Sequence, residues 1–212
     1  MDKKLNFLIS AGPTREWIDP VRFISNPSSG KMGYALAKEA QKRNCSVTLV
    51  TGPVHLSEPE GVCVKRVETA EQMKKEMLEN FDNADFVIMC AAVCDHRPEV
   101  QWEQKKKKED FPNQIKLVPT IDILSELSNR KKESQILVGF AAETENFEQN
   151  AKIKLRKKNL DWIALNDVSQ KKIGFNSDHN EITMFSSNQN KVKLEFSTKE
   201  VLATQMLELI IK

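Results

Sequence analysis

Residues 5–43 read LNFLISAGPTREWIDPVRFISNPSSGKMGYALAKEAQKR, and this stretch indicates the fold class. It begins with an apolar strand pattern at 5–10 and ends with helical periodicity at 31–43. Further apolar runs at 47–50, 86–90, 135–140 and 162–165 alternate with helical patterns at 70–79, 121–128 and 147–158. Such alternation, with strands apolar on both faces, predicts a doubly wound α/β fold with a mainly parallel, Rossmann-like sheet.

The hydrophobic pattern of the C-terminal part differs from that of the rest of the chain. Residues 182–185 and 192–196 alternate apolar with polar side chains around SSNQN, which predicts a β-hairpin appended to the sheet. Thr198 is then placed to cap a final helix. Because no internal repeat or low-complexity linker interrupts the sequence, we expect residues 1–212 to form a single domain.

Composition excludes several function classes. The net charge of +2 argues against a general nucleic-acid or membrane-surface binder. No apolar run approaches the roughly 20 residues of a membrane span, and the N-terminus lacks a signal-peptide pattern, so we expect a cytoplasmic protein. The four cysteines form no CxxC, and the three histidines are scattered, so we expect structural thiols and no protein-built metal site.

Ligands of doubly wound sheets bind at the carboxyl ends of the strands, where the strand order reverses. The loop after the first strand, residues 11–30, has neither GxGxxG nor a P-loop. It offers Ser28-Ser29-Gly30 at a helix N-terminus, a natural anion site, and the positive charge of Arg22. A capped helix after an ordinary surface loop is the alternative.

Later loops carry further candidates. Ala91 and Ala92 are small enough for a planar ligand to approach, and Asp95 can accept hydrogen bonds from a ribose or base. The run Lys105–Lys108 suits either a phosphate-binding lid or a solvated surface. Phe140 can stack on a base or pack in the core, and two helical lysines four residues apart share one face, either toward a polyphosphate or toward solvent. These are Lys154 and Lys158.

Five blocks together resemble the phosphopantothenoylcysteine synthetase family. They are SAGPTREWIDPVRFISNPSSGKMGYALA at 10–37, AAVCDHRP at 91–98, GFAAET at 139–144, KNLDWIALNDV at 158–168 and GFNSD at 174–178. The resemblance implies an enzyme of coenzyme A biosynthesis that ligates 4'-phosphopantothenate with L-cysteine. It also implies an acyl-nucleotide intermediate formed from CTP, or from ATP as in eukaryotic members, with Mg²⁺ held largely by phosphate oxygens. A homodimer and a stand-alone form of the ligase are further implications.

The resemblance also assigns roles to residues. Asn26, Arg22 and Lys105 would be catalytic, with any of Lys105–Lys108 a candidate for the lid lysine. The phosphopantothenate site would comprise Arg22, Asn26, Ser28, Ser29 and Gly30, and the nucleotide site Ala91, Ala92, Asp95, Lys105, Phe140, Lys154 and Lys158. The family's usual Asn-Pro-Asp is Thr120-Ile121-Asp122 in this chain, which weakens the choice of CTP over ATP.

Two other functions fit parts of the sequence. A nicotinamide-dependent oxidoreductase shares this kind of sheet, but GxGxxG and an acidic residue at the end of the second strand are both missing. A non-enzymatic nucleotide-binding module would use the lysine clusters without any release of pyrophosphate.

Overall fold

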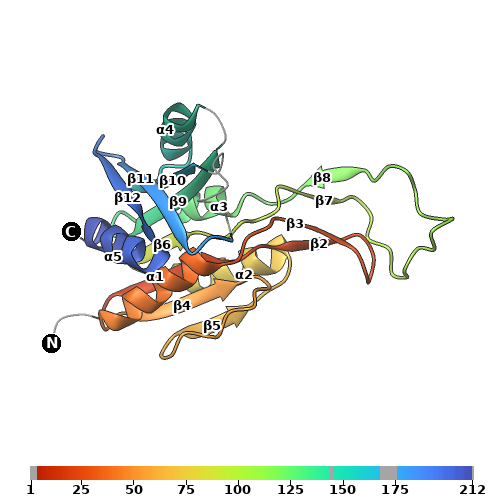
Figure 1. The fold of residues 1–212 in the computed structure, drawn as a ribbon, viewed down its shortest axis with the longest axis horizontal. Coiled ribbons are helices and arrows are strands. Elements are labelled where there is room, and N and C mark those ends of the chain that lie inside the picture. Colours follow the sequence, from red (N-terminus) through yellow and green to blue (C-terminus); the bar gives the residue numbers. More distant parts are fainter. Residues whose placement is uncertain (1–3, 144–145, 168–175, 212) are drawn as a thin grey trace.

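The fold is built on one large sheet, seen in a computed structural model that describes residues 4–143, 146–167 and 176–211. The strands of this sheet are β1 (Asn6–Ala11), β4 (Ser46–Thr51), β5 (Cys63–Arg66), β6 (Phe86–Met89), β9 (Ile136–Glu143), β10 (Trp162–Asp167), β11 (His179–Ser186) and β12 (Lys191–Thr198). They lie in the order β12-β11-β10-β9-β6-β1-β4-β5 (Figure 1). The ends of three blocks quoted above, residues 144, 168 and 174–175, lie outside the described residues.

The strands from β10 to β5 pair in parallel, whereas β11 pairs antiparallel with both β10 and β12. The predicted α/β, mainly parallel, doubly wound fold is therefore confirmed. The predicted hairpin appended to the sheet is confirmed as well. It extends the main sheet past β10, and side chains such as Ile182 and Leu194 on its inner face are buried in the core.

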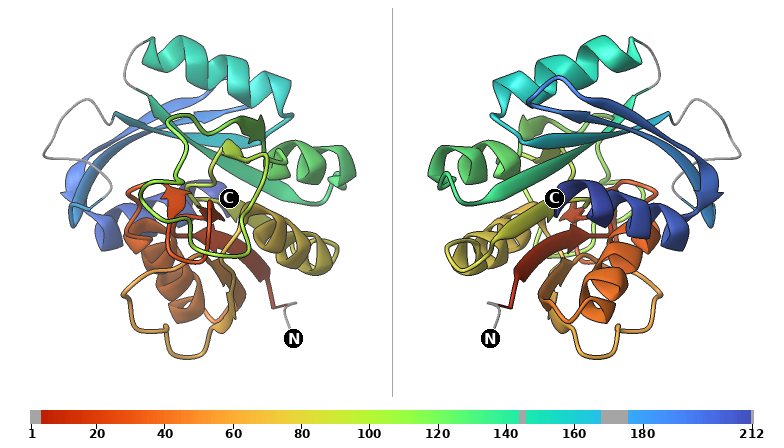
Figure 2. Two further views of the ribbon diagram at one scale, coloured as in Figure 1. Left: turned by 90° about the vertical axis from the view of Figure 1, so that its right-hand side faces the viewer. Right: turned by 90° about the vertical axis from the view of Figure 1, so that its left-hand side faces the viewer.

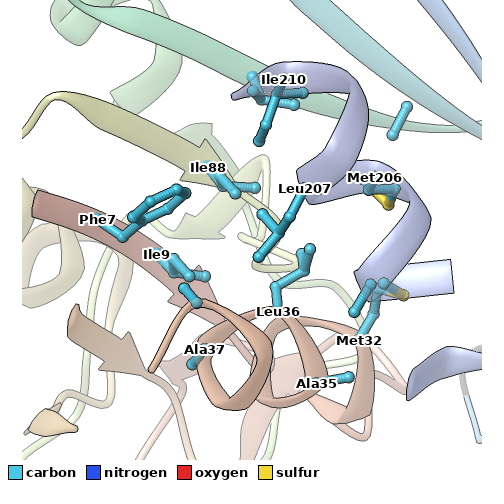
Figure 3. Packing of buried hydrophobic residues seen from close by; sticks show 14 of the residues in the cluster. Phe7, Ile9, Met32, Ala35, Leu36, Ala37, Ile88, Met206, Leu207 and Ile210 are labelled. Atoms are coloured by element: carbon cyan, nitrogen blue, oxygen red, sulfur yellow. The ribbon is translucent and has the colours of Figure 1, made fainter. Parts of the chain in front are cut away.

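Helices cover both faces of the sheet (Figure 2). They are α1 (Lys31–Lys42), α2 (Ala70–Phe81), α3 (Ile123–Arg130), α4 (Phe147–Lys157) and α5 (Lys199–Ile210). Side chains of α1 and α5 share one apolar core with Phe7 and Ile9 of β1, and Figure 3 shows Leu36 and Leu207 beside them. Leu8, between those two β1 residues, points into a second core with α2, α3 and α4. One strand thus feeds two cores.

Helix α1 lies unusually close to β1. A Cβ atom added to Gly33 would stand 2.6 Å from the Ala11 Cβ and 3.1 Å from the Ser10 carbonyl oxygen. The glycine permits this approach, which brings the N-terminus of α1 to the carboxyl end of β1.

Two loops expected from the sequence contain short strands and project from the body of the protein (Figure 1). They hold β2 (Arg15–Trp17), β3 (Phe23–Ser25), β7 (His96–Pro98) and β8 (Leu117–Pro119), with β2 paired to β3 and β7 to β8. We call residues 15–25 and 96–119 together the arm. The Trp102 backbone N–H donates to the Ile18 carbonyl at 2.9 Å, which ties the two segments of the arm together.

The topology fixes where a ligand can bind. The chain passes from β1 outward to β4 and β5 and then returns across the sheet to β6, so the strand order reverses between β1 and β6. Loops that leave these two strands diverge and open a crevice at their carboxyl ends. Among the described residues, no helix is both long and apolar enough to cross a membrane.

Candidate active site

A cleft of about 740 Å³ opens at the reversal point between β1 and β6. Its walls come from the N-terminus of α1, from the carboxyl ends of β6, β9 and β10, and from the segment before α3. Ten of the sequence-predicted site residues line it: Asn26, Ser28, Ser29, Gly30, Ala91, Ala92, Asp95, Phe140, Lys154 and Lys158. Residues that follow β1 and β6 therefore meet residues of β9 and of the helix after it in one place, as the topology argument predicted.

Asn26 joins the loops that follow β1 and β6. Its side-chain Nδ2 donates to the Ala92 and Val93 carbonyl oxygens, each at 3.1 Å. The half-buried Asn26 side chain thereby holds the loop after β6 against the segment that leads into α1. Because Nδ2 makes these contacts, Oδ1 is the atom of the Asn26 amide that can accept a hydrogen bond from a ligand.

The N-terminus of α1 has the features of an anion site. Gly30, with φ 76°, is its N-cap residue and provides no side-chain cap, and the first turn contains no acidic residue. A Cβ atom on Gly30 would lie 2.8 Å from the Val54 side chain, so only glycine fits this start. The free backbone N–H groups of the first turn and the helix dipole both favour a bound anion.

Lys154 of α4 and Lys158, the C-cap residue of this helix, reach the opposite wall of the cleft. The Lys154 ammonium donates to the Phe140 carbonyl oxygen at 2.8 Å, and the Lys158 ammonium donates to Asp122 and to the Ser125 hydroxyl. Burial raises the pKa of Asp122, but the hydrogen bonds from Lys158 and Ser125 outweigh it and hold the pKa below the ordinary value. Asp122 also caps α3 by accepting from the Ser125 backbone N–H, so Thr120-Ile121-Asp122 keeps the capping carboxylate of the stretch.

The alanines after β6 offer surface rather than hydrogen bonds. The Ala91 N–H donates to the Ser10 hydroxyl at 3.1 Å, and the Ala92 N–H donates to the Gly12 carbonyl at 2.9 Å. Since both amides have partners inside the protein, the two residues give a ligand only a small apolar platform. Asp95 is exposed beside them and is the cleft carboxylate nearest to that platform in the sequence.

Comparison with known proteins places this geometry in a family. A sequence profile described as the DNA/pantothenate metabolism flavoprotein C-terminal domain (DFP) matches residues 3–212. The chain belongs to the DFP family. It is 45% identical over 202 residues to the coenzyme A biosynthesis bifunctional protein CoaBC of Bacillus subtilis, covering 95% of the DFP chain and 50% of that protein. The chain spans about half the length of the curated relatives it matches.

Solved structures agree with this family assignment. The crystal structure of the C-terminal domain of CoaBC superposes with a TM-score of 0.83 at 40% identity and covers 97% of the DFP chain and 93% of that domain. A Cab2 mutant in complex with phosphopantothenate-cysteine superposes with a TM-score of 0.77 at 16% identity and covers 98% and 85% of the two chains. The second likeness shows the common fold.

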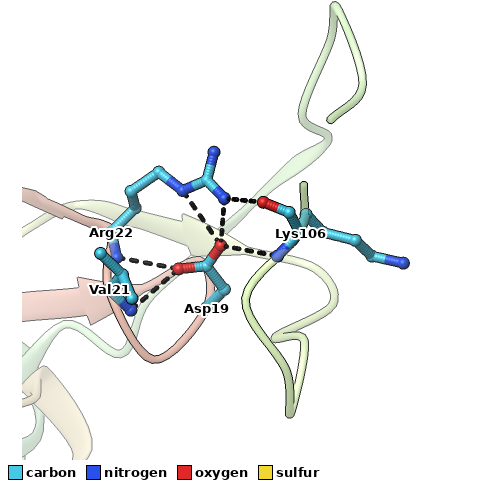
Figure 4. Close-up of polar contacts among 4 residues, drawn as sticks. All are labelled: Asp19, Val21, Arg22 and Lys106. Atoms are coloured by element: carbon cyan, nitrogen blue, oxygen red, sulfur yellow. Dashed lines mark hydrogen bonds and ion pairs between the residues drawn. The ribbon is translucent and has the colours of Figure 1, made fainter. Parts of the chain in front are cut away.

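Arg22 and Lys105 lie on the arm of the DFP chain and do not line the cleft. Arg22 pairs with Asp19 at 2.7 Å, donates to the Lys106 carbonyl at 2.6 Å and lies 3.9 Å from the Phe111 ring centre (Figure 4). Burial raises the pKa of Asp19, but hydrogen bonds from Val21, Arg22 and Lys106 outweigh it and hold the pKa below its ordinary value. This network fixes the backbone of the lysine run, and both predicted residues line a separate hollow with it.

Six polar residues of the cleft were not predicted as site residues: Lys31, Thr120, Asp122, Asn166, Asn180 and Lys199. The Asn166 Oδ1 is buried and has no hydrogen-bond partner among the described residues. Asn166 lies near the carboxyl end of β10, where the sequence already shows a polar residue after an apolar run. Asn180 and Lys199 had no such signal, because only the return of the hairpin beside β10 brings them to the cleft.

Cys90 lines the cleft but is poorly suited to nucleophilic chemistry. Burial raises the pKa of its thiol to about 12, an effect that nearby Lys199 only partly opposes. Cys45 and Cys94 are buried, and Cys63 is exposed on β5. The raised pKa keeps Cys90 protonated at neutral pH and supports the expectation of a structural thiol.

Proposed function

We propose that this chain is a phosphopantothenate–cysteine ligase of coenzyme A biosynthesis, with CTP as its nucleotide. The observation that carries the proposal is the pairing of two cationic or anion-binding walls across one cleft. The N-terminus of α1, with Ser28 to Gly30, forms one wall, and Lys154 and Lys158 of α4 form the other. A cleft of about 740 Å³ is large enough for a nucleotide and a second substrate. The similarity to CoaBC of Bacillus subtilis supports a reaction of coenzyme A biosynthesis.

The reaction has two displacements. The carboxylate of 4'-phosphopantothenate attacks the α-phosphate of CTP, which forms an acyl-cytidylate and releases pyrophosphate. The cysteine amine then attacks the acyl carbon, loses a proton and releases CMP. Both steps need positioning and charge neutralisation more than covalent help from the protein. We assign Asn26, next to the α1 anion site, to the acyl-nucleotide, and Lys154, Lys158, Asp95 and Phe140 to the nucleotide.

Mg²⁺ fits the cleft mainly as a companion of the triphosphate. The cleft is lined by two carboxylates, Asp95 and Asp122, and Asp122 is already engaged by Lys158. Among the described residues, no group of three or more His, Cys, Asp or Glu side chains could hold a metal ion alone. Phosphate oxygens would therefore supply most ligands, as Mg²⁺ generally permits, and the ion would neutralise the charge that develops on pyrophosphate.

We further propose that the working form is a homodimer. Four exposed large apolar side chains, Val21, Phe23, Val100 and Leu117, gather on the arm, where a second copy can cover them. Arg22 and Lys105 lie on the same arm and outside the cleft of their own chain. A partner arm would explain how both residues take part in catalysis.

The remaining expectations belong to the same proposal. Residues 1–212 would act as a single ligase domain. The cytoplasm is the compartment that supplies CTP, cysteine and a reducing environment for the free cysteines.

Pyrophosphate release with CTP or ATP, in the presence of 4'-phosphopantothenate and cysteine, tests the function. We expect release only when the phosphopantothenate and a nucleotide are both present, and faster release with CTP. Faster release with ATP would overturn the choice of nucleotide. Thermal stabilisation by NAD(P) but not by CTP or ATP would favour an oxidoreductase instead.

The lysine run needs its own test. Lys105→Gln should mainly slow formation of the acyl-cytidylate, measured by trapping the intermediate with radiolabelled CTP. The same substitution at Lys106, Lys107 and Lys108 shows which lysine acts. A wild-type rate in all four variants would remove this run from the mechanism.

A further inference from the structure

Lys199 is a buried cation that the proposed chemistry leaves without a role. It is the first residue of α5, is only 5% exposed and lines the cleft. Its backbone N–H donates to the Asp178 carbonyl at 2.9 Å, which fixes the start of the helix beside the cleft. Lysine is rarely buried to this degree, because removing an ammonium from water is costly.

The groups around Lys199 act on its ammonium in both directions. Burial lowers the pKa of Lys199, and the neighbouring Lys31 ammonium lowers it further, while Cys90 and Asp178 oppose the shift. The Asp178 carboxylate is paired with Lys31 at 2.6 Å. An anion bound beside both ammonium groups would offset this cost.

Lys31 and Lys199 stand on the opposite side of the sheet from the nucleotide lysines. They belong to α1 and α5, whose apolar faces share one core, whereas Lys154 and Lys158 belong to the end of α4, which packs in the other core. Ser28, Ser29 and Gly30 lie next to Lys31 in the chain. The cleft thus has a second cationic end, formed by Lys31, Lys199 and the N-terminus of α1.

We propose that Lys199 binds the phosphate monoester of 4'-phosphopantothenate and makes the enzyme select this substrate over unphosphorylated pantothenate. The proposal rests on the ligase function proposed above. The phosphate and the reacting carboxylate occupy opposite ends of the pantothenate skeleton. When the carboxylate meets the nucleotide near α4, the phosphate extends toward the α1 and α5 end. A dianion there gains a charge-assisted hydrogen bond from a cation that is already desolvated.

Lys199→Gln is the decisive variant, with Lys199→Arg as the conservative one and Lys38→Gln as a matched control on the exposed face of α1. We expect Lys199→Gln to raise KM for 4'-phosphopantothenate about tenfold or more, a typical loss for one charged hydrogen bond. KM for CTP should stay within about twofold, and the preference for 4'-phosphopantothenate over pantothenate should fall by the same factor. Lys199→Arg should recover most of the preference, and Lys38→Gln should match the wild type.

Three results would overturn the proposal. They are an unchanged preference for the phosphorylated substrate in Lys199→Gln, a rise in KM for CTP alone, and a loss of discrimination between cysteine and cysteamine. The last result would place the cysteine carboxylate beside Lys199.

Equilibrium binding of 4'-phosphopantothenate and of pantothenate, measured by calorimetry, separates this proposal from the ligase function. If the wild type binds the phosphorylated form selectively, and Lys199→Gln does not, the inference stands even without turnover. If the wild type binds neither compound, the inference fails together with the proposed substrate. Thermal unfolding of each variant verifies that it is folded under the assay conditions.

Discussion

Replacing Asn26 by aspartate reverses the polarity of one contact at the centre of the cleft. In the native protein, Nδ2 donates to the Ala92 and Val93 carbonyl oxygens at 3.1 Å each. Aspartate has almost the same shape, but an ionised carboxylate has no proton to donate and would face two carbonyl oxygens. Asn26→Ala removes the same two hydrogen bonds without adding a charge.

The magnitudes follow from these contacts. Two lost hydrogen bonds at about 1 kcal/mol each predict that Asn26→Ala lowers the free energy of unfolding by about 2 kcal/mol. Asn26→Asp should lose about 4 kcal/mol at pH 8, since a half-buried carboxylate is also left facing two acceptors. Protonation of the introduced carboxylate restores one donor, so the pKa of this group in the folded protein lies above its unfolded value. The folded state then binds more protons, and the extra penalty must grow as pH rises through that interval.

Urea unfolding of both variants at pH 5 and pH 8 measures these differences. We expect the gap between Asn26→Asp and Asn26→Ala to be about 2 kcal/mol at pH 8 and smaller at pH 5. Asn80→Asp is a matched control, because Asn80 donates a single bond to the Glu76 carbonyl of α2, away from the cleft. If Asn26→Asp is as stable as the wild type at pH 8, the Nδ2 contacts do not hold the loop after β6. In turnover, Asn26→Asp should accumulate the acyl-cytidylate, and a wild-type rate of conversion to product would refute its assignment.

Three further outcomes follow from other contacts. Gly33→Ala should destabilise the protein by about 1–2 kcal/mol in urea unfolding, since the cost of overpacking against Ala11 exceeds the roughly 1 kcal/mol gain in helix propensity. The control Lys38→Ala on the same helix should change the stability little, and a stabilised Gly33→Ala would disprove the close packing of α1. Cys90, with a pKa of about 12, is thiolate in only about one molecule in 10⁴ at pH 8, so alkylation of the native protein should modify Cys63 first. Mass spectrometry identifies the modified residue, and early modification of Cys90 would contradict the burial argument. The lowered pKa of Asp122 gives stability that is present above the ordinary pKa of 3.8 and is lost as the pH falls below it. Asp122→Asn should therefore flatten this part of the acid unfolding curve, and an unchanged curve would show that the contact with Lys158 is not stabilising.

The sheet and its helices were predictable because their signal is local. Phe7, Leu8 and Ile9 are all apolar, which indicates a strand buried on both faces, and Thr198 precedes the last helix as its cap. The position of the cleft could also be predicted, because the carboxyl ends of parallel strands lie at the same edge of the sheet. The hairpin was also predictable, because its two halves alternate apolar and polar residues, but the strand that it joins was not: β11 pairs antiparallel with β10.

The parts that escaped prediction depend on tertiary structure. The strands of the arm are three residues each, too short for periodicity to show. Arg22 and Lys105 lie in the same loops as cleft residues, so the sequence does not show that the arm places their side chains outside the cleft. No sequence pattern indicates that Lys199 is buried, because its burial results from the docking of α5 beside α1.

The shared core of α1 and α5 also bears on synthesis of the protein. Leu36 of α1 packs with Leu207 of α5, so about 170 residues separate partners in one apolar cluster. Strands β1 and β4 can cover part of the apolar face of α1 early in translation, but the part that faces α5 is covered only after residues 199–210 have left the ribosome. The side of the sheet that holds Lys199 is therefore the last to be completed.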